Sequence, residues 1–133
     1  MNMRTMNEVY ASAGPVQGYQ AQTDVARWYD LPSFGYAAYS DSKTLDQQWA
    51  AEAAITTITG MLSRATLLHD VGYLEAGLQG SYESILFGDE LIGYAKAFMS
   101  ELRVDDEALA LDEIKAVGPG GDHLARPYTR QHY

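Results

Sequence analysis

The sequence contains no cysteine. Disulfides, thiolate metal sites and cysteine nucleophiles are therefore excluded, and the absence fits a reducing cytoplasm. No apolar run approaches the roughly 20 residues of a membrane span, and residues 1–5 lack the apolar stretch of a signal peptide. We therefore expect a cytoplasmic protein that does not enter a membrane.

Positive charge is also scarce. The chain has 9 Lys and Arg residues against 18 Asp and Glu, which gives a net charge of −9. Such a surface repels phosphate backbones, so no nucleic-acid partner is expected. Most of the acidic groups lie within residues 69–113. They form either a solvated face or a surface for a basic partner.

Length sets a further limit. The 133 residues suit a single domain over residues 1–133. A closed eight-stranded α/β barrel needs roughly 250 residues, so the chain is too short to form one alone. Hydrophobic residues make up 47% of the sequence, which is enough for a packed core.

Helices and strands alternate along the chain. We predict helices over residues 16–29, 44–63 and 82–102 and strands over 34–39 and 65–68, followed by a shorter helix that begins at Asp105 and ends at a glycine-rich turn over 118–121. The pattern Thr44-x-x-Gln47 predicts a capping box, and Ser81 and Asp105 are typical helix caps.

Apolar spacing predicts which face of each helix is buried. For the three longer helices the predicted faces comprise, in order, Val25, Trp28 and Tyr29; Ala50, Ala53, Ala54, Ile58 and Met61; and Ile85, Leu86, Ile92, Ala95 and Met99.

The alternation predicts parallel strands. Two or three strands with helices on them leave strand edges unmatched. We therefore expect an α/β fold that is part of a TIM-type (β/α) barrel, with about two to three strand–helix units and extra C-terminal helices.

Polar side chains follow both predicted strands. Asp41 and Lys43 come after the first strand, and His69 and Asp70 come after the second. Because parallel strands deliver their C-terminal ends to one edge, these groups are expected to share one site.

Six motifs occur in a characteristic order. They are Asp41-Ser42-Lys43-x-x-Asp46-x-Gln48, Glu52, His69-Asp70-x-Gly72-Tyr73-Leu74-x-x-Gly77, Ser81-x-Glu83, Asp89-Glu90-x-Ile92-Gly93 and Val117-Gly118-Pro119-Gly120-Gly121. In this order the chain resembles the C-terminal third to half of the trimethylamine methyltransferase family.

That resemblance implies an α/β barrel that moves a methyl group from a methylated amine to the cobalt of a separate corrinoid protein. The chain itself would bind no cofactor, because the corrinoid belongs to the partner. Trimethylamine-specific members use an in-frame pyrrolysine, whereas relatives without it act on other quaternary amines such as glycine betaine. The present sequence contains only standard residues.

Three residues are candidate catalytic groups. His69 could orient the substrate or transfer a proton near neutral pH, or it could cap the strand. Asp41 could face the substrate cation or cap the next helix. Glu83 could act as an acid or could stabilise the start of its helix.

Three more residues are candidate substrate-binding groups. Tyr73 could contribute to an aromatic cage or pack on the barrel rim. Asp70 could contact substrate or form a turn. Tyr39, with Tyr36, could line the barrel interior or pack beneath it.

Several other polar residues have simpler interpretations. Lys43 could pair with Asp41 or Asp46, while Gln48 and Glu52 lie four apart and should brace a helix. His123 and His132 lack partners at metal-ligand spacing, so no metal site is expected.

Two alternatives to an autonomous enzyme remain open at this point. The chain could be a non-catalytic truncated or split-barrel fragment that acts only by association with a partner, because its strands are few. It could also be an α/β module that binds a carbohydrate or an amine. The sequence leaves the oligomeric state open, with a homo-oligomer as one outcome.

Overall fold

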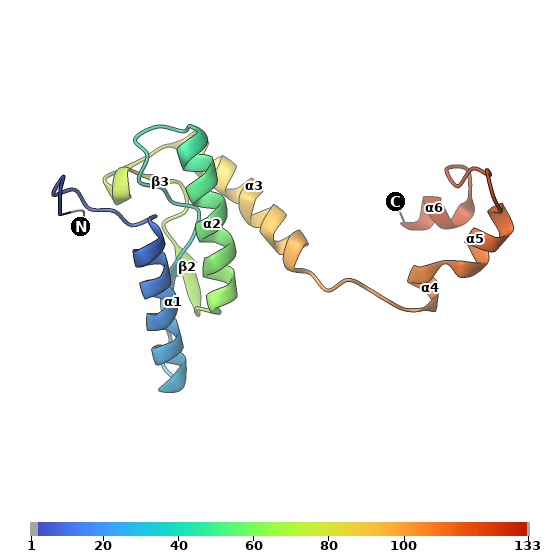
Figure 1. Cartoon of the computed structure of the whole chain (residues 1–133), viewed down its shortest axis with the longest axis horizontal. Helices are drawn as coiled ribbons and strands as arrows, with labels where there is room; N and C mark the ends of the chain where they lie inside the picture. Colours follow the sequence, from blue (N-terminus) through green and yellow to red (C-terminus); the bar gives the residue numbers. More distant parts are fainter. Residues whose placement is uncertain (1–2, 133) are drawn as a thin grey trace. The chain divides into compact units, whose positions relative to one another are not determined.

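The structure is a computed structural model that describes residues 3–132. The chain divides into a first unit that ends at Met99 and a second that begins at Ser100 (Figure 1). The first unit contains α1 (Ala13–Trp28), β1 (Phe34–Tyr36), α2 (Gln47–Ser63), β2 (Leu67–His69), β3 (Tyr73–Leu74), the 3-10 turn η1 (Glu75–Gly77), β4 (Gln79–Gly80) and α3 (Tyr82–Met99). The second contains α4 (Asp106–Leu109), α5 (Leu111–Val117) and α6 (Pro127–His132).

Strands β1 and β2 pair in parallel, as predicted, in the register Phe34↔Leu67, Gly35↔Leu68 and Tyr36↔His69. Helix α2 connects them, and both α1 and α2 pack against β1 (Figure 1). The first strand is shorter than predicted because Ala38 adopts a left-handed conformation (φ 53°) just beyond it. The α/β class is confirmed. The described residues contain this one parallel pair and no closed barrel, so the barrel stays a prediction.

The start of α2 differs from the prediction. The N-cap is Asp46, whose carboxylate accepts a hydrogen bond from the Trp49 amide at 2.9 Å. The predicted capping box of Thr44 and Gln47 is therefore wrong. Thr44 instead donates its hydroxyl to the Asp46 carboxylate.

The buried face of α2 is also displaced from the predicted stripe. It consists of Trp49, Ala53, Thr56, Thr57 and Gly60. The two threonine hydroxyls donate to the Ala53 carbonyl at 3.1 and 2.7 Å, which lets polar side chains occupy the interior without an unpaired group. Of the five predicted positions, only Ala53 is fully buried.

A second pair of strands was not predicted. β3 and β4 form a short antiparallel hairpin in the segment expected to be a loop. Asp70, Gly72 and Gly77 have positive φ values of 71°, 86° and 88°, so the chain can reverse twice within a few residues. The left-handed conformations of Asp70 and the two glycines therefore allow this segment to form a hairpin where a loop was expected.

Helix α3 begins as predicted, since the Ser81 hydroxyl accepts a hydrogen bond from the Ser84 amide at 3.0 Å. Its buried residues are Ser84, Gly88 and Ala95, whereas the predicted Ile85, Leu86 and Met99 are exposed. Small residues face inward because the helix approaches its neighbours closely. A Cβ on Gly88 would lie 2.7 Å from the Val71 side chain.

The predicted apolar face of the first helix is also wrong. Val25, Trp28 and Tyr29 are all exposed, and α1 instead buries Val16 and Thr23. No helix in the part of the chain that the structure describes has the length and hydropathy of a membrane span.

The second unit has a different construction. Asp105 caps α4 as predicted, by accepting from the Ala108 amide at 2.8 Å. The predicted single helix is divided into α4 and α5 because Ala110 is left-handed (φ 49°). The tail, for which no element was predicted, contains α6.

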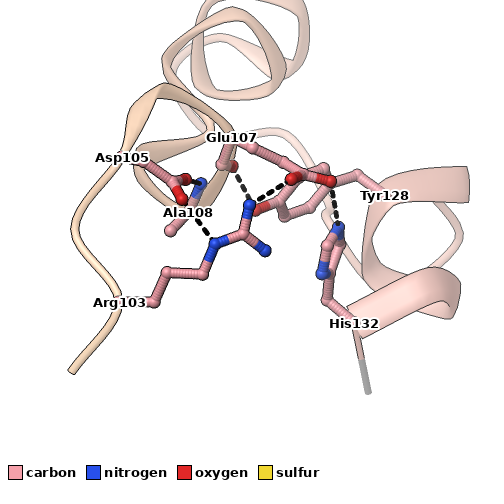
Figure 2. Close-up of polar contacts among 6 residues, drawn as sticks. All are labelled: Arg103, Asp105, Glu107, Ala108, Tyr128 and His132. Carbon is pink, nitrogen blue, oxygen red and sulfur yellow. Dashed lines mark hydrogen bonds and ion pairs between the residues drawn. The ribbon is translucent and has the colours of Figure 1, made fainter. Parts of the chain in front are cut away.

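Charged side chains hold the second unit together (Figure 2). The Glu107 carboxylate faces the guanidinium of Arg103 and lies 3.8 Å from the His132 ring, while the Tyr128 hydroxyl donates to the Glu107 carbonyl at 2.5 Å. None of the described residues in α4, α5 and α6 is buried. The contacts of this unit are therefore mainly solvent-exposed.

Candidate functional site

The candidate site lies where the two parallel strands end. The segments that follow β1 and β2 remain paired beyond the strands: the Ala37 amide donates to the His69 carbonyl at 3.0 Å and the Gly72 amide donates to the Ala38 carbonyl at 2.8 Å. The Ser40 amide then donates to the Tyr73 carbonyl at 3.1 Å. Backbone hydrogen bonds thus hold the two loops at one edge of the sheet.

Aromatic rings gather along the strands that lead to this edge. Tyr36 is central, with its ring centroid 4.3 Å from that of Tyr19, 4.8 Å from that of His69 and 6.0 Å from that of Tyr39. Phe34 packs edge-on against His69 at 5.7 Å. We call these five residues the aromatic cluster. They come from α1, β1, the loop after β1, and β2.

Carboxylates flank the aromatic cluster. Burial raises the pKa of the Tyr19 hydroxyl first, and Tyr36 and the charges of Asp41 and Asp70 raise it further. Burial likewise raises the pKa of Tyr39, and the same two carboxylates contribute. Both acids therefore act electrostatically on both tyrosines, which stay protonated at neutral pH.

His69 and Asp70 form a hydrogen-bonded pair. The His69 Nδ1 atom lies 2.5 Å from the Asp70 Oδ1 atom. An imidazole whose Nδ1 hydrogen is donated to a carboxylate exposes Nε2 as an acceptor, and it becomes a donor there when protonated. The pair therefore fixes the His69 ring, which is itself a member of the aromatic cluster, through its Nδ1 atom.

Asp41 binds the N-terminal segment. Its two carboxylate oxygens accept hydrogen bonds from the Tyr10 amide at 2.8 Å and the Ala11 amide at 3.2 Å. The buried Tyr39 hydroxyl donates to the Tyr10 carbonyl at 3.1 Å. Asp41 does not cap α2, because Asp46 occupies that position.

Tyr10 lies beside a further acid. Its hydroxyl donates to the Glu8 carboxylate at 2.7 Å, and this hydrogen bond is the main reason that its pKa is raised to about 12. Sequence reasoning missed Glu8, Tyr10 and Tyr19. No local pattern marks them, because their positions follow from how α1 and residues 8–11 pack on the strand ends.

A cleft of about 360 Å³ borders Asp41. Its lining includes Glu8, Lys43 and Glu75, and the Lys43 ammonium lies 2.8 Å from the Glu75 carboxylate. That hydrogen bond raises the pKa of Lys43 and lowers the pKa of Glu75. The predicted pairing of Lys43 with Asp41 or Asp46 is therefore wrong: the partner comes from the hairpin.

The structure brings together four of the six predicted site residues, namely His69, Asp70, Asp41 and Tyr39. Tyr73 lies on β3, and within residues 3–132 its ring has no ring contact with the aromatic cluster. Glu83 is exposed in the first turn of α3. The roles predicted for Tyr73 and Glu83 stay predictions.

Metal binding has no visible basis in the described residues, among which no three His, Asp or Glu side chains form a ligand set. The chemistry available at this edge is that of aromatic faces, carboxylates and one imidazole. Such groups suit a small organic cation.

Comparison with known proteins gives a consistent result. Residues 1–133 match the family model described as trimethylamine methyltransferase (MTTB). A glycine betaine methyltransferase from Desulfitobacterium hafniense (strain Y51) is 33% identical over 114 residues, which cover 85% of this chain and 24% of that protein. A trimethylamine methyltransferase MttB from Methanosarcina thermophila is 35% identical over 111 residues, which cover 84% of this chain and 23% of that protein. The chain therefore spans about a quarter of the length of these relatives.

Proposed function

This chain belongs to the trimethylamine methyltransferase family, and on that basis we propose that it takes part in moving a methyl group from trimethylamine or a related methylated or quaternary amine to the cobalt of a separate corrinoid protein. The two relatives named above are a glycine betaine and a trimethylamine methyltransferase. The proposal therefore covers methylated amines as a class.

The observation that carries the proposal is the aromatic cluster at the strand ends. Tyr36 has Tyr19, Tyr39 and His69 around it, with ring centroids 4.3 to 6.0 Å away. The faces of aromatic rings attract ammonium groups, and methylated ammonium suits them best because it carries little bound water. The cluster is thus a chemically suitable surface for the charged end of the substrate.

The two carboxylates add charge selectivity. Asp41 and Asp70 lie close enough to raise the pKa values of Tyr19 and Tyr39, because their negative charges disfavour the tyrosinate anions. The same charges attract a cation that binds near those rings. Within the described residues the only cation that lines the neighbouring cleft is Lys43, which is paired with Glu75. The site therefore favours a positive ligand.

His69 is the group we propose for the leaving amine. In the reaction the N–C bond breaks, nitrogen keeps the electron pair, and the methyl group passes to the partner's cobalt. The Nε2 atom of His69 can donate a hydrogen bond or a proton to the departing nitrogen, while Asp70 holds the ring through Nδ1.

The amine-binding part is tested with tetramethylammonium. Its binding to the chain is measured by NMR titration, with tert-butanol as a neutral ligand of similar size. We expect tetramethylammonium to bind and Tyr36→Leu to weaken it roughly 3- to 30-fold, because a cation–π contact contributes about 0.5 to 2 kcal/mol. The matched control is Tyr94→Leu, which removes an exposed tyrosine from α3 and should leave the affinity unchanged.

Two results would contradict the amine-binding part of the proposal. Equal affinity for tert-butanol would show that the site recognises size and not charge. Unchanged affinity in Tyr36→Leu would place amine binding elsewhere. The transfer step is tested by mixing the chain with cob(I)alamin and either trimethylamine or glycine betaine, and following the formation of methylcobalamin by absorbance. Formation no faster than in the absence of the protein would contradict the proposed transfer.

A further inference from the structure

Glu52 links helix α2 to the loop after β1. Its Oε2 atom accepts hydrogen bonds from the Ser40 hydroxyl at 2.6 Å and from the Asp41 amide at 2.9 Å. Its Oε1 atom accepts from the Gln48 side-chain amide at 2.9 Å. The partly buried carboxylate therefore has three donors, and two of them belong to the strand-end loop.

Hydrogen bonds connect the loop after β1, which Glu52 holds, to the hairpin of β3 and β4. The Ser40 hydroxyl, which donates to Glu52, accepts from the Ser42 amide at 2.9 Å, and both serines are buried. The Ser40 carbonyl accepts from the Ala76 amide at 3.3 Å, and the Ser42 carbonyl accepts from the Glu75 amide at 2.8 Å. One carboxylate thus holds the turn to which the hairpin is bonded.

Asp41 lies between Glu52 and the N-terminal segment. The Asp41 backbone amide donates to the Glu52 carboxylate. The Asp41 carboxylate in turn accepts hydrogen bonds from the amides of Tyr10 and Ala11. A hydrogen bond to a charged acceptor is about twice as strong as a neutral one, so the bonds to Glu52 dominate the local geometry of this turn. Removing the Glu52 carboxylate therefore takes two hydrogen bonds from the turn that carries Asp41.

We propose that Glu52 is a positioning residue for the amine site, which holds Asp41 and the two strand-end loops in place without contacting the amine. This inference rests on the proposed function. The sequence pattern indicates only that Glu52 braces its own helix, since Gln48 lies four residues before it. The contacts to Ser40 and Asp41 give it a second role that helix bracing does not explain.

The experiment compares Glu52→Gln with Glu52→Ala in the full chain. The glutamine keeps a carbonyl oxygen for Ser40 and Asp41, and the Gln48 amide can turn to accept from its NH₂ group, so we expect affinity for tetramethylammonium within about threefold of wild type. Alanine removes every acceptor. We expect it to weaken that affinity about tenfold or more and to speed hydrogen exchange at the Asp41 amide by a similar factor.

Matched controls separate positioning from stability. Glu90→Ala removes an exposed glutamate of α3 and should change neither measurement. Urea unfolding reports any loss of global stability. If Glu52→Ala does not fold, Ser40→Ala removes the hydroxyl that donates to Glu52 and accepts from the Ser42 amide, and it should change both measurements in the same direction.

The possible outcomes are distinct. Wild-type affinity in Glu52→Ala together with a lower urea midpoint would make Glu52 merely structural and would overturn the inference. Equal affinity losses in the glutamine and alanine variants, with hydrogen exchange at the Asp41 amide unchanged in Glu52→Gln, would mean that the charge of Glu52 acts on the amine directly, which also overturns positioning. If wild type does not bind tetramethylammonium, the proposed function fails. In that case faster exchange at Asp41 in Glu52→Ala would still support its role in holding the loop, and unchanged exchange would overturn that role too.

Discussion

Two aspartate caps in the chain have nearly the same geometry but belong to very different regions. Asp46 accepts from the Trp49 amide at 2.9 Å to begin α2, and Asp105 accepts from the Ala108 amide at 2.8 Å to begin α4. Helix α2 continues for 17 residues, five of them buried, whereas α4 has four residues and none is buried. The same local signal therefore begins both a core helix and a surface turn.

The two regions also differ in what holds them together. In the first unit Trp49, Ala53 and Leu74 form a buried cluster, with Trp49 stacked on Phe87. In the second unit the main contacts are ion pairs, namely the exposed pairs of Arg103 and the partly buried pair of Arg126 with Glu113, and exposed pairs contribute little to stability in water. We therefore expect the first unit to respond to packing changes and the second to pH and salt.

The largest expected effect is on the buried cluster. Trp49 is 0% exposed and its indole N–H donates to the Tyr73 carbonyl at 3.3 Å. Trp49→Ala should lower the free energy of unfolding of the first unit by about 3 to 5 kcal/mol. Urea titration followed by far-UV circular dichroism measures the loss. Trp28→Ala, at a position 85% exposed, is the control and should change stability by less than about 0.5 kcal/mol. Comparable losses in the two variants would contradict the assigned core.

A smaller effect with opposite signs is expected at two helical glycines. A Cβ on Gly60 would lie 2.5 Å from the Tyr36 carbonyl oxygen, so Gly60→Ala should destabilise the first unit by about 1 to 3 kcal/mol. A Cβ on Gly93 would meet no described atom outside its own helix within 4 Å, and Gly93→Ala should stabilise α3 by about 0.5 to 1 kcal/mol. Thermal unfolding distinguishes the two. If Gly60→Ala is also stabilising, α2 does not approach β1 as closely as described.

The smallest effect is on the second unit at low pH. The Ala108 amide and then Arg103 lower the pKa of Asp105 below its ordinary 3.8, and Arg126 lowers the pKa of Glu113 below its ordinary 4.5. Groups with lowered pKa values stabilise the folded state above their ordinary pKa, and this contribution is lost as the pH falls through the lowered value.

We therefore expect the helical Cα chemical shifts of α4 and α5 to fade as the pH drops below about 4. The cap of α2 is the internal control. The Trp49 backbone amide likewise lowers the pKa of Asp46. Only the first turn of α2 should lose helical chemical shifts at low pH, because the buried residues of α2 hold the rest of the helix in place. Loss of α2 and α4 together would mean that the two regions are not held by different forces.

The proximity of four residues of the candidate site could be anticipated from the sequence. Parallel strands end at the same edge of a sheet, and this predicted that His69 and Asp70 lie near Asp41 and Tyr39. The prediction required only two short strands and the helix between them. It could not include Tyr19, Tyr10 or Glu8, because those residues reach the strand ends through the packing of α1 and of the N-terminal segment. The pairing of Lys43 with Glu75 also depends on a hairpin that has no signal in the sequence beyond its glycines.

The caps at Ser81 and Asp105 and the parallel pairing of β1 with β2 followed from the sequence alone, because a cap needs only a side-chain oxygen and an amide two or three residues away. The cap of α2, at Asp46 and not Thr44, did not. Which face of each helix is buried was decided only by the tertiary structure. Thr56 and Thr57 can be buried because their hydroxyls donate to the Ala53 carbonyl of their own helix. Gly60 and Gly88 allow their helices to lie close to Tyr36 and Val71, where a larger apolar residue would clash.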